Sequence, residues 1–323
     1  MAVGILLVGG LGTRLAPLTN KTPKPMLPIA NLPVTEHQLL VAKAAGITKV
    51  VLATAYLAET FTPYFGDGSK WGIDLKYAIE SEPLGTGGAI RNAAELILAE
   101  ISESEPIVVF NGDVLSRHDL AAQIKLHQET MADVTLHLVK VEDARPYGCV
   151  PFDESGRVTD FLEKMEAPLT NTINAGCYIF KPQVIRELLL GKAISVEREV
   201  FPELLRKNKL IQSFVDDSYW LDMGTPKALL KGSHDYVGVK DFIVGTGSTI
   251  SQTARISGAS AIGNGVTIGE RVEIFASIIR DGATIGEGSS LRNVFVEVAA
   301  VVPANTSASA AYLADGQVIE MNF

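Results

Sequence analysis

The chain has 323 residues, more than the roughly 100–200 of a typical domain, so we expect one large domain and one smaller one. Its 47% hydrophobic and 20% charged residues exclude a disordered or collagen-like chain. Lys and Arg number 28 against 37 Asp and Glu, and the resulting net charge of −9 disfavours nucleic acid and anionic membranes as partners.

The cysteine content and the N-terminus indicate a cytoplasmic protein. Cys149 and Cys177 are the two cysteines, and without a C-x-x-C spacing they suggest neither a disulfide framework nor a cysteine zinc site. No basic residue precedes the short apolar run at the N-terminus, and no apolar stretch reaches about 18 residues, so neither a signal peptide nor a membrane span is expected.

Residues 1–240 have the pattern of an α/β domain. An apolar run over 3–8 ends at Gly9 and Gly10, as a buried parallel strand does before a loop. Helix-like patterns follow from 34 to Gly46 and over 87–101, and they alternate with strand-like runs over 47–55 and 106–113. Strand-like segments over 132–141, 148–164 and 173–181 predict that the sheet becomes mixed. Ligands bind beyond the carboxyl ends of such strands, where Gly9, Gly10 and Asp113 should lie.

Residues 241–323 carry a six-residue repeat. Isoleucine recurs at this spacing from Ile250 to Ile274 and, after a slip of one residue, the row continues from Ile279 to Leu291. This period is typical of a hexapeptide β-helix, with an ordinary β-rich domain as the alternative. The segment over 310–323 has no such period and is expected to cap or to pair. A short solenoid favours self-association into a homo-oligomer, whereas an acyltransferase is disfavoured because no histidine follows His234.

The segment GGLGTRLAPLTNKTPKPMLPI, residues 9–29, has the features of a polyphosphate cradle. Glycines after a strand let backbone N–H groups approach phosphate oxygens, while Arg14 offers a planar fork and Lys24 a point charge. The segment is neither a Walker A loop nor a G-x-G-x-x-G motif. The alternative is a glycine turn with a solvated Arg and Lys.

Asp113 and Asp222 each follow an apolar strand-like run. Carboxylates at strand ends are hard oxygen ligands that suit Mg²⁺ held jointly with substrate phosphates, although a helix cap or a turn is the alternative for either. The histidines form no H-x-x-x-H pair and no G-x-S-x-G elbow occurs, so a zinc hydrolase and a serine hydrolase are disfavoured.

These motifs carry a resemblance. GGLGTRLAPLT, PKPMLPI, EPLGTGGA, FNGD, FLEK, INAG, SVEREVFP and WLDMGTP follow one another in an order that resembles the sugar-1-phosphate nucleotidylyltransferases over residues 3 to about 230. The repeats similarly resemble the left-handed β-helix of many members. The resemblance implies a Rossmann-like domain, small-molecule substrates (a nucleoside triphosphate and a sugar 1-phosphate) and Mg²⁺ as cofactor.

The resemblance also implies roles for individual residues. Lys24 would face the reacting phosphates, and Asp113 and Asp222 would hold Mg²⁺. The triphosphate would bind to Gly9, Gly10, Gly12, Thr13 and Arg14, with Gly85 and Thr86 also at the nucleotide. The sugar phosphate would bind to Lys164, and the sugar hydroxyls to Glu163, Asn174, Gly176 and Gly148.

Two acidic residues bear on the choice of base. Guanine presents two adjacent donors, to which a carboxylate offers matched acceptors, whereas uracil or thymine suits a Gln. Glu80 and Glu82 precede Gly85 in YAIESEPLG and favour guanine, with Glu80 preferred because its position matches a base-reading Gln of the thymidylyltransferases. Either residue could instead be a solvated loop acid.

The resemblance is greatest to the members that use GTP and mannose 1-phosphate. UTP, dTTP or ATP with glucose 1-phosphate, or GTP with a manno-heptose 1-phosphate, stay as alternatives. A regulatory protein that binds a nucleotide sugar without turnover is disfavoured, because Arg14, Lys24, Asp113 and Asp222 are all present.

Overall fold

The computed structural model describes residues 2–10, 12–55, 57–162, 166–314 and 316–321. Its contacts group into two compact units, Met1–Gly10 with Thr35–Trp220 and Leu11–Val34 with Leu221–Phe323. The second unit therefore joins an N-terminal segment to the C-terminal repeats. The sequence analysis placed a boundary between two domains at residue 240. The grouping of contacts does not test where a domain boundary lies, so this boundary stays a prediction.

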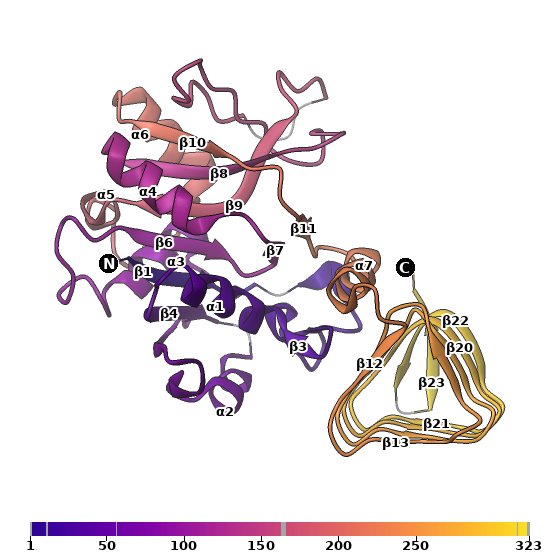
Figure 1. Cartoon of the computed structure of the whole chain (residues 1–323). Helices are drawn as coiled ribbons and strands as arrows, with labels where there is room; N and C mark the ends of the chain where they lie inside the picture. Colours follow the sequence, from indigo (N-terminus) through magenta and orange to yellow (C-terminus); the bar gives the residue numbers. More distant parts are fainter. Residues whose placement is uncertain (1, 11, 56, 163–165, 315, 322–323) are drawn as a thin grey trace. The chain divides into compact units, whose positions relative to one another are not determined.

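The first unit is built on a mixed sheet with the strand order β10-β8-β9-β6-β1-β4-β5 (Figure 1). β1 pairs in parallel with β4 and β6, and β4 with β5, whereas β9 runs antiparallel to β6 and β8. The Rossmann-like α/β fold with a mixed sheet is thereby confirmed. The strands are β1 (Val3–Leu7), β4 (Lys49–Thr54), β5 (Asp74–Ile79), β6 (Ile107–Asn111), β7 (Val114–Ser116), β8 (Val134–Lys140), β9 (Thr172–Phe180) and β10 (Ile211–Val215).

Helices cover both faces of this sheet. Val134 and Leu136 of β8 belong to the core that includes buried side chains of α3, α5 and α6. Thr135 points to the opposite face by strand alternation, and there it contacts His127 of α4. The helices of this part of the chain are α1 (Val34–Ala44), α2 (Thr62–Phe65), α3 (Gly85–Ala94), α4 (Leu120–Thr130), α5 (Pro182–Arg186) and α6 (Phe201–Arg206).

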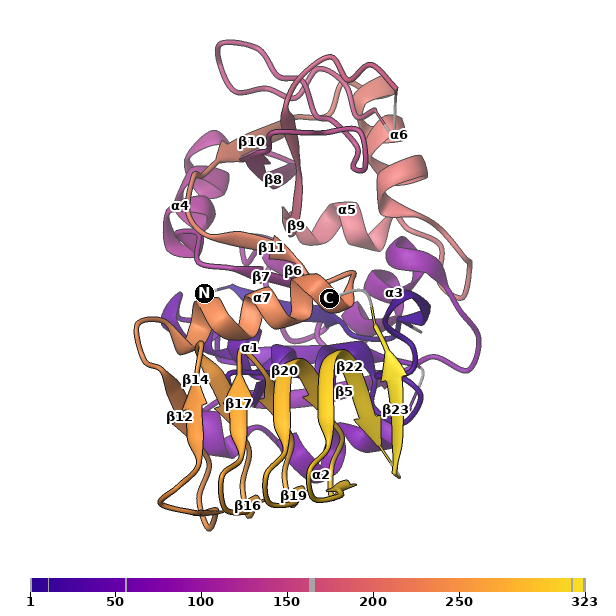
Figure 2. The same ribbon diagram turned by 90° about the vertical axis from the view of Figure 1, so that its right-hand side faces the viewer.

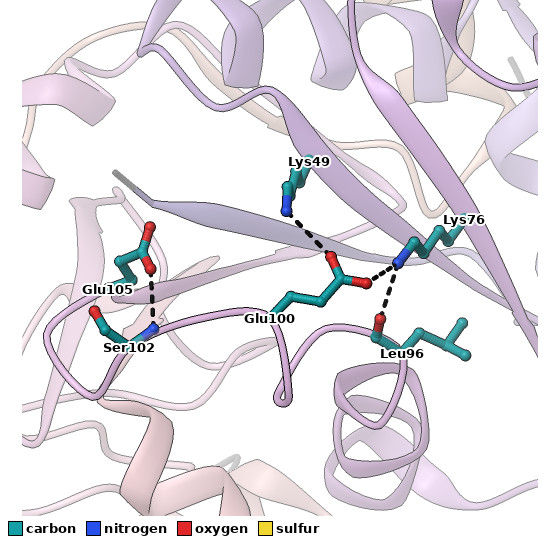
Figure 3. A network of polar contacts seen from close by, with 6 residues as sticks. All are labelled: Lys49, Lys76, Leu96, Glu100, Ser102 and Glu105. Carbon is teal, nitrogen blue, oxygen red and sulfur yellow. Dashed lines mark hydrogen bonds and ion pairs between the residues drawn. The ribbon is translucent and has the colours of Figure 1, made fainter.

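Two predicted elements differ from the structure. The second helix was expected to reach residue 101, but α3 ends at Ala94 and the chain continues in turns. These turns bring the carbonyl of Leu96 and the carboxylate of Glu100 to Lys76, at 3.1 and 2.6 Å, while Lys49 contacts the same carboxylate at 3.1 Å (Figure 3). The strands expected over 148–164 are isolated bridges in the described part of that range, such as Phe152 with Val158.

The C-terminal strands form the predicted β-helix, whose triangular cross-section is visible in Figure 1. Figure 2 shows β14, β17, β20, β22 and β23 side by side along one face. The strands are β12 (Phe242–Val244), β13 (Thr249–Ile250), β14 (Arg255–Ser257), β15 (Ser260–Ile262), β16 (Thr267–Ile268), β17 (Glu273–Phe275), β18 (Ile278–Ile279), β19 (Thr284–Ile285), β20 (Ser290–Val296), β21 (Val301–Val302), β22 (Ser307–Ala314) and β23 (Gln317–Glu320).

The repeat of the sequence becomes the interior of this solenoid. Ile262, Ile268, Ile274, Ile279 and Ile285 are buried in one apolar cluster. Thr249 pairs with Thr267 in the next coil, 18 residues later, whereas Thr267 pairs with Thr284, 17 residues later. The slip in the sequence is therefore a coil shortened by one residue. The final segment pairs, since β23 runs antiparallel to β22.

The second unit also contains α7 (Pro226–Val237) and a small hairpin of β2 (Pro28–Ile29) and β3 (Leu32–Pro33). α7 packs against β2 and against β15 of the β-helix. β11 (Trp220–Asp222) precedes α7 in the chain. Across the described ranges, no helix combines the length and the apolar character needed to cross a membrane.

Two buried histidines make the first unit sensitive to acid. Desolvation lowers the pKa of His127 to about 4 and that of His137 to about 3. His137 is 1% exposed and stacks on His118 with ring centroids 3.9 Å apart. An unfolded histidine has a pKa of about 6.5. The unfolded chain therefore binds more protons below that pH, and the folded state loses stability as the pH falls.

We predict that the free energy of unfolding falls between pH 7.5 and pH 5 by on the order of 2 kcal/mol for each of these histidines. Urea unfolding at the two pH values measures this loss. The variant His137→Phe keeps a ring against His118 and removes one titrating group. The free energy of unfolding of this variant should therefore fall by less than that of the wild type, by about the contribution of one histidine. An equal loss in the wild type and the variant would contradict the assignment.

Candidate functional site

The predicted phosphate-binding segment from Gly12 onward lies in the second unit. Gly12 has a left-handed backbone with φ 63°, and its carbonyl accepts a hydrogen bond from Thr19 Oγ1 at 3.1 Å. Thr13 and Arg14 begin a short 3₁₀ turn and are exposed. Lys24 is only 7% exposed, so its ammonium is presented from a packed position rather than from a mobile surface side chain.

Asp222 meets this segment within the same unit. Its carboxylate Oδ1 lies 4.0 Å from Lys24 Nζ. A Cβ on Gly224 would lie 3.0 Å from Arg14 Nη2 and 3.1 Å from Asp222 Oδ1, so a side chain there would require both groups to shift by a few tenths of an ångström. The next residue, Thr225, caps α7 by accepting a hydrogen bond from the amide of Ala228 at 3.2 Å. Two cationic side chains and one carboxylate therefore converge within this unit.

The remaining glycines of the cradle and Asp113 lie in the first unit, at the ends of neighbouring strands. β1 and β6 are parallel, with Leu7 opposite Asn111, so Gly9, Gly10 and Asp113 follow adjacent carboxyl ends. Gly112 makes this closeness possible, because its amide donates to Leu7 O at 2.9 Å and a Cβ would lie 2.3 Å from that oxygen.

The donor set suits a hard divalent cation that is shared with a substrate. Asp113 and Asp222 are both half-buried carboxylates at strand ends. Across the residues with described positions, no group of three or more His, Cys, Asp and Glu forms a metal-binding cluster. Single carboxylates fit Mg²⁺, which keeps water and phosphate oxygens among its ligands.

The two acidic candidates for base recognition have different environments. Glu80 directly follows β5, is half-buried, and accepts a hydrogen bond from the amide of Leu84 at 3.1 Å. Burial raises the pKa of Glu80 above its usual value. Glu82 is exposed. A fixed, partly desolvated acceptor is the more selective partner for a base.

Gly85 and Thr86 begin α3 and are fixed by a distant segment of the same unit. A Cβ on Gly85 would lie 2.7 Å from the carbonyl oxygen of Ile194. Thr86 Oγ1 donates to Glu197 Oε2 at 2.8 Å and accepts from the amide of Val196 at 2.9 Å. The hydroxyl of Thr86 therefore holds α3 in place, a structural task beyond the nucleotide contact that was predicted.

Asn174 and Gly176 lie on a bulge of β9. Leu138 pairs with Asn174 and Leu136 with Tyr178, so β9 has extra residues between these pairs. Gly176 has φ 77°, and its amide donates to Asn174 Oδ1 at 3.1 Å. The bulge thereby fixes the amide side chain of Asn174.

The other predicted sugar-side residues are only partly described. Gly148 precedes Cys149, which bridges to Ile173 of β9 and to Leu162. Gly148 is thus next to the segment that carries Asn174. Glu163 and Lys164 lie outside the described residues.

A buried polar network behind Asn174 was missed by the sequence analysis. Tyr178 is fully buried, and its hydroxyl accepts from Asn174 Nδ2 at 2.8 Å and Asn111 Nδ2 at 3.2 Å while donating to Glu197 Oε1 at 3.1 Å. Burial raises the pKa of Tyr178 well above its usual value. Trp220 Nε1 donates to the carbonyl of Ala175 at 2.9 Å, within the bulge. The motifs FNGD, INAG and SVEREVFP contain Asn111, Asn174 and Glu197, but nothing in the sequence indicated that these residues share Tyr178 as a partner.

Several known proteins are similar to this chain. A family model described as Nucleotidyl transferase matches residues 3–238. Mannose-1-phosphate guanylyltransferase of Mycobacterium tuberculosis is 45% identical over 88% of this chain and 81% of its own. A probable mannose-1-phosphate guanylyltransferase 3 of Oryza sativa subsp. japonica is 34% identical, with coverages of 91% and 82%. The crystal structure of HddC from Yersinia pseudotuberculosis complexed with GMP-PN has a TM-score of 0.62 at 30% identity and covers 73% of this chain and 100% of that one.

We predict that Tyr178→Phe lowers the free energy of unfolding by about 1–3 kcal/mol, because two amide donors and one carboxylate lose a buried partner. The control is Tyr77→Phe, which removes an exposed hydrogen bond to the carbonyl of Gly66 and should cost less. Urea unfolding of both variants measures the difference. Equal losses would argue against the network as a buried, shared structure.

Proposed function

We propose, because the chain belongs to the nucleotidyl transferase family, that this enzyme transfers a guanylyl group from GTP to mannose 1-phosphate and releases pyrophosphate with formation of GDP-mannose. The observation that carries the proposal is the convergence of Lys24, Asp222 and the Arg14 guanidinium around Gly224. The relatives named mannose-1-phosphate guanylyltransferase support the choice of both substrates.

The chemistry requires positioning and charge rather than a nucleophilic side chain. The attacking group is a phosphate oxygen of the sugar phosphate, which is already anionic and needs no general base. It displaces pyrophosphate at the α-phosphorus of GTP in line. The protein must hold two mutually repelling anions together, and Arg14 and Lys24 supply positive charge to the triphosphate. Gly9, Gly10, Gly12 and Thr13 are proposed to supply backbone and hydroxyl donors to the same phosphates.

Members of this family use a divalent metal, and we propose that it is Mg²⁺ here. When bound, Mg²⁺ neutralises phosphate charge and polarises the phosphoryl oxygens. Asp222 and Asp113 are each proposed to offer a carboxylate oxygen to it. The 4.0 Å separation between Asp222 and Lys24 supports a role for this carboxylate beside the phosphates.

The sugar phosphate is proposed to contact residues of the first unit. Lys164 would bind its phosphate, and Glu163, Gly148, Asn174 and Gly176 would bind its hydroxyl groups. Asn174 is supported by its fixed position, since both ends of its amide are hydrogen-bonded. A fixed amide loses less entropy on binding a sugar than a mobile one.

The nucleotide base is proposed to contact Glu80, with Gly85, Thr86 and Glu82 nearby in the same segment. A carboxylate offers acceptors to both N1–H and N2–H₂ of guanine. The half-buried position of Glu80 and its contact with Leu84 support Glu80 over Glu82. Guanylyl transfer to a different sugar 1-phosphate is the second candidate. HddC was solved with GMP-PN, which supports guanine as the base but says nothing about which sugar phosphate this chain uses.

Assembly and location are further proposals. A homo-oligomer formed through the β-helix is in keeping with its exposed apolar residues, such as Val301, Val318 and Ile319. Both cysteines are free and buried, which supports a reducing cytoplasm.

The direct test is pyrophosphate release across an array of nucleoside triphosphates and sugar 1-phosphates. We predict that GTP with mannose 1-phosphate has the highest kcat/KM. A preference for UTP or dTTP would refute the guanine proposal, whereas a preference for GTP with another sugar would refute mannose alone. Absence of pyrophosphate release with every pair would refute the enzyme proposal as a whole.

We predict that Asp222→Asn lowers kcat by about a hundredfold or more at saturating Mg²⁺, because the loss of one electrostatic stabiliser typically costs roughly 10²–10³ in rate. Circular dichroism and the melting temperature check that the variant is folded. The exposed variant Asp241→Asn, in the same unit, serves as the control and should turn over normally. A folded Asp222→Asn enzyme with wild-type turnover would eliminate this role.

We predict that Glu80→Gln lowers kcat/KM for GTP by roughly tenfold to a hundredfold, because a donor then faces a donor at a cost of about 1–3 kcal/mol. UTP or dTTP should lose less or improve. ITP lacks the 2-amino group, so it should be poorer than GTP for the wild type and recover part of that difference in the variant. Glu82→Gln is the control, and an equal effect of both substitutions would count against Glu80.

A further inference from the structure

The segment that carries Arg14 and Lys24 is anchored on the β-helix and α7 within the second unit. At its far end, Asn31 adopts a left-handed conformation with φ 68° and donates from Nδ2 to the carbonyl of Ile262 in β15 at 2.6 Å. The amide of the neighbouring Ala30 donates to Ser233 Oγ of α7 at 3.2 Å, and Ser233 is fully buried. The β2–β3 hairpin is therefore fixed to the solenoid.

A second anchor lies two residues before Lys24. Arg280, which follows β18, donates from Nη1 to Thr22 Oγ1 at 3.1 Å. The same guanidinium contacts Glu297, and the two side chains are 13% and 10% exposed. Glu297 also accepts from Tyr312 at 3.0 Å and from the amide of Val298 at 2.8 Å. A buried arginine held in this way is a rigid donor toward Thr22.

The chain between Thr22 and Lys24 is stiff. Pro23 and Pro25 flank Lys24, and each proline ring fixes its own φ. The amides of Met26 and Leu27 close a 3₁₀ turn on the carbonyls of Pro23 and Lys24, at 2.8 and 3.1 Å. We therefore expect a displacement of Thr22 to be passed on to Lys24, because the two prolines leave this short segment few free backbone torsions.

We propose that the β-helix positions the phosphate-binding segment, and that Arg280 is a positioning residue that acts on Lys24 through Thr22. This rests on the proposed function in one respect, the placement of Lys24 at the phosphates. The solenoid then contributes to turnover in each chain by itself, whether or not it also mediates assembly. Arg280 touches no substrate in this account.

The test compares variants that remove the anchor without leaving a lone buried charge. Thr22→Val is isosteric and removes the hydroxyl that Arg280 reaches, and Thr22→Ser restores a hydroxyl. Arg280→Met combined with Glu297→Gln removes both charges of the buried pair, since removal of one alone is strongly destabilising. Arg255→Met is the matched control, because Arg255 faces Glu273 on the same solenoid at 3.8 Å with both side chains exposed.

We expect Thr22→Val and the Arg280→Met, Glu297→Gln pair to lower kcat/KM for GTP by about tenfold to a hundredfold, with a smaller change in KM for the sugar phosphate. Thr22→Ser should recover most of the loss and Arg255→Met should lose nothing. Combining Thr22→Val with the Arg280→Met, Glu297→Gln pair should lower kcat/KM little further, because both changes remove the same contact between Arg280 and Thr22. Equal effects on both substrates with a lowered melting temperature would overturn positioning in favour of general destabilisation.

Hydrogen exchange gives a readout that does not depend on turnover. Peptides covering residues 18–27 should exchange faster in Thr22→Val and in the Arg280 pair than in the wild type or Arg255→Met, while the β-helix itself keeps its protection. Unchanged exchange in this segment overturns the anchor. If the wild type transfers no nucleotide to any sugar phosphate, the proposed function fails, and faster exchange in the variants would still support the anchor.

Discussion

The close packing around Gly224 is the constraint on which the proposed phosphate site depends. A Cβ at that position would lie 3.0 Å from Arg14 Nη2 and 3.1 Å from Asp222 Oδ1, so both side chains would have to shift by a few tenths of an ångström to admit it. The guanidinium of Arg14 and the carboxylate of Asp222, from segments some two hundred residues apart in the chain, both approach this backbone position. The cap that Thr225 makes on α7 then fixes the direction of the chain beyond them.

The proposed chemistry needs few side chains. An anionic oxygen attacks an anionic phosphate, so the principal barrier that a protein can lower is electrostatic repulsion together with the entropy of alignment. A lysine that is nearly buried and flanked by prolines loses little freedom when it meets a phosphate. The same reasoning applies to the proposed sugar site, where Asn174 is held by the backbone of its own bulge and by a buried tyrosine. Fixed polar groups do not have to reorganise during the reaction, and this is the advantage of building them into a packed frame.

Much of the fold could be predicted because it depends on local periodicity. Apolar runs ending at glycine or aspartate gave the strands β1 and β6, and the isoleucine repeat gave the β-helix, including the coil shortened by one residue. Contacts between distant segments carry no such signal. The hydrogen bond from Thr86 to Glu197 joins residues 111 positions apart, and the bulge at Gly176 depends on how β8 and β9 align. The end of α3 was misplaced for the same reason, since the turns after it are held by lysines of other strands. Motif order indicated which residues belong to the candidate site, but the partners that hold them required the structure.

The central claim is that transfer proceeds by a single displacement promoted by position and charge alone, and the stereochemical course at the α-phosphorus tests it most directly. Guanosine 5′-(α-thio)triphosphate of one configuration is converted with mannose 1-phosphate, and the configuration of the thio-substituted sugar nucleotide is determined by phosphorus NMR. A direct in-line attack predicts inversion at phosphorus. Retention would require two successive displacements through a covalent nucleotidyl-enzyme, and it would contradict the account.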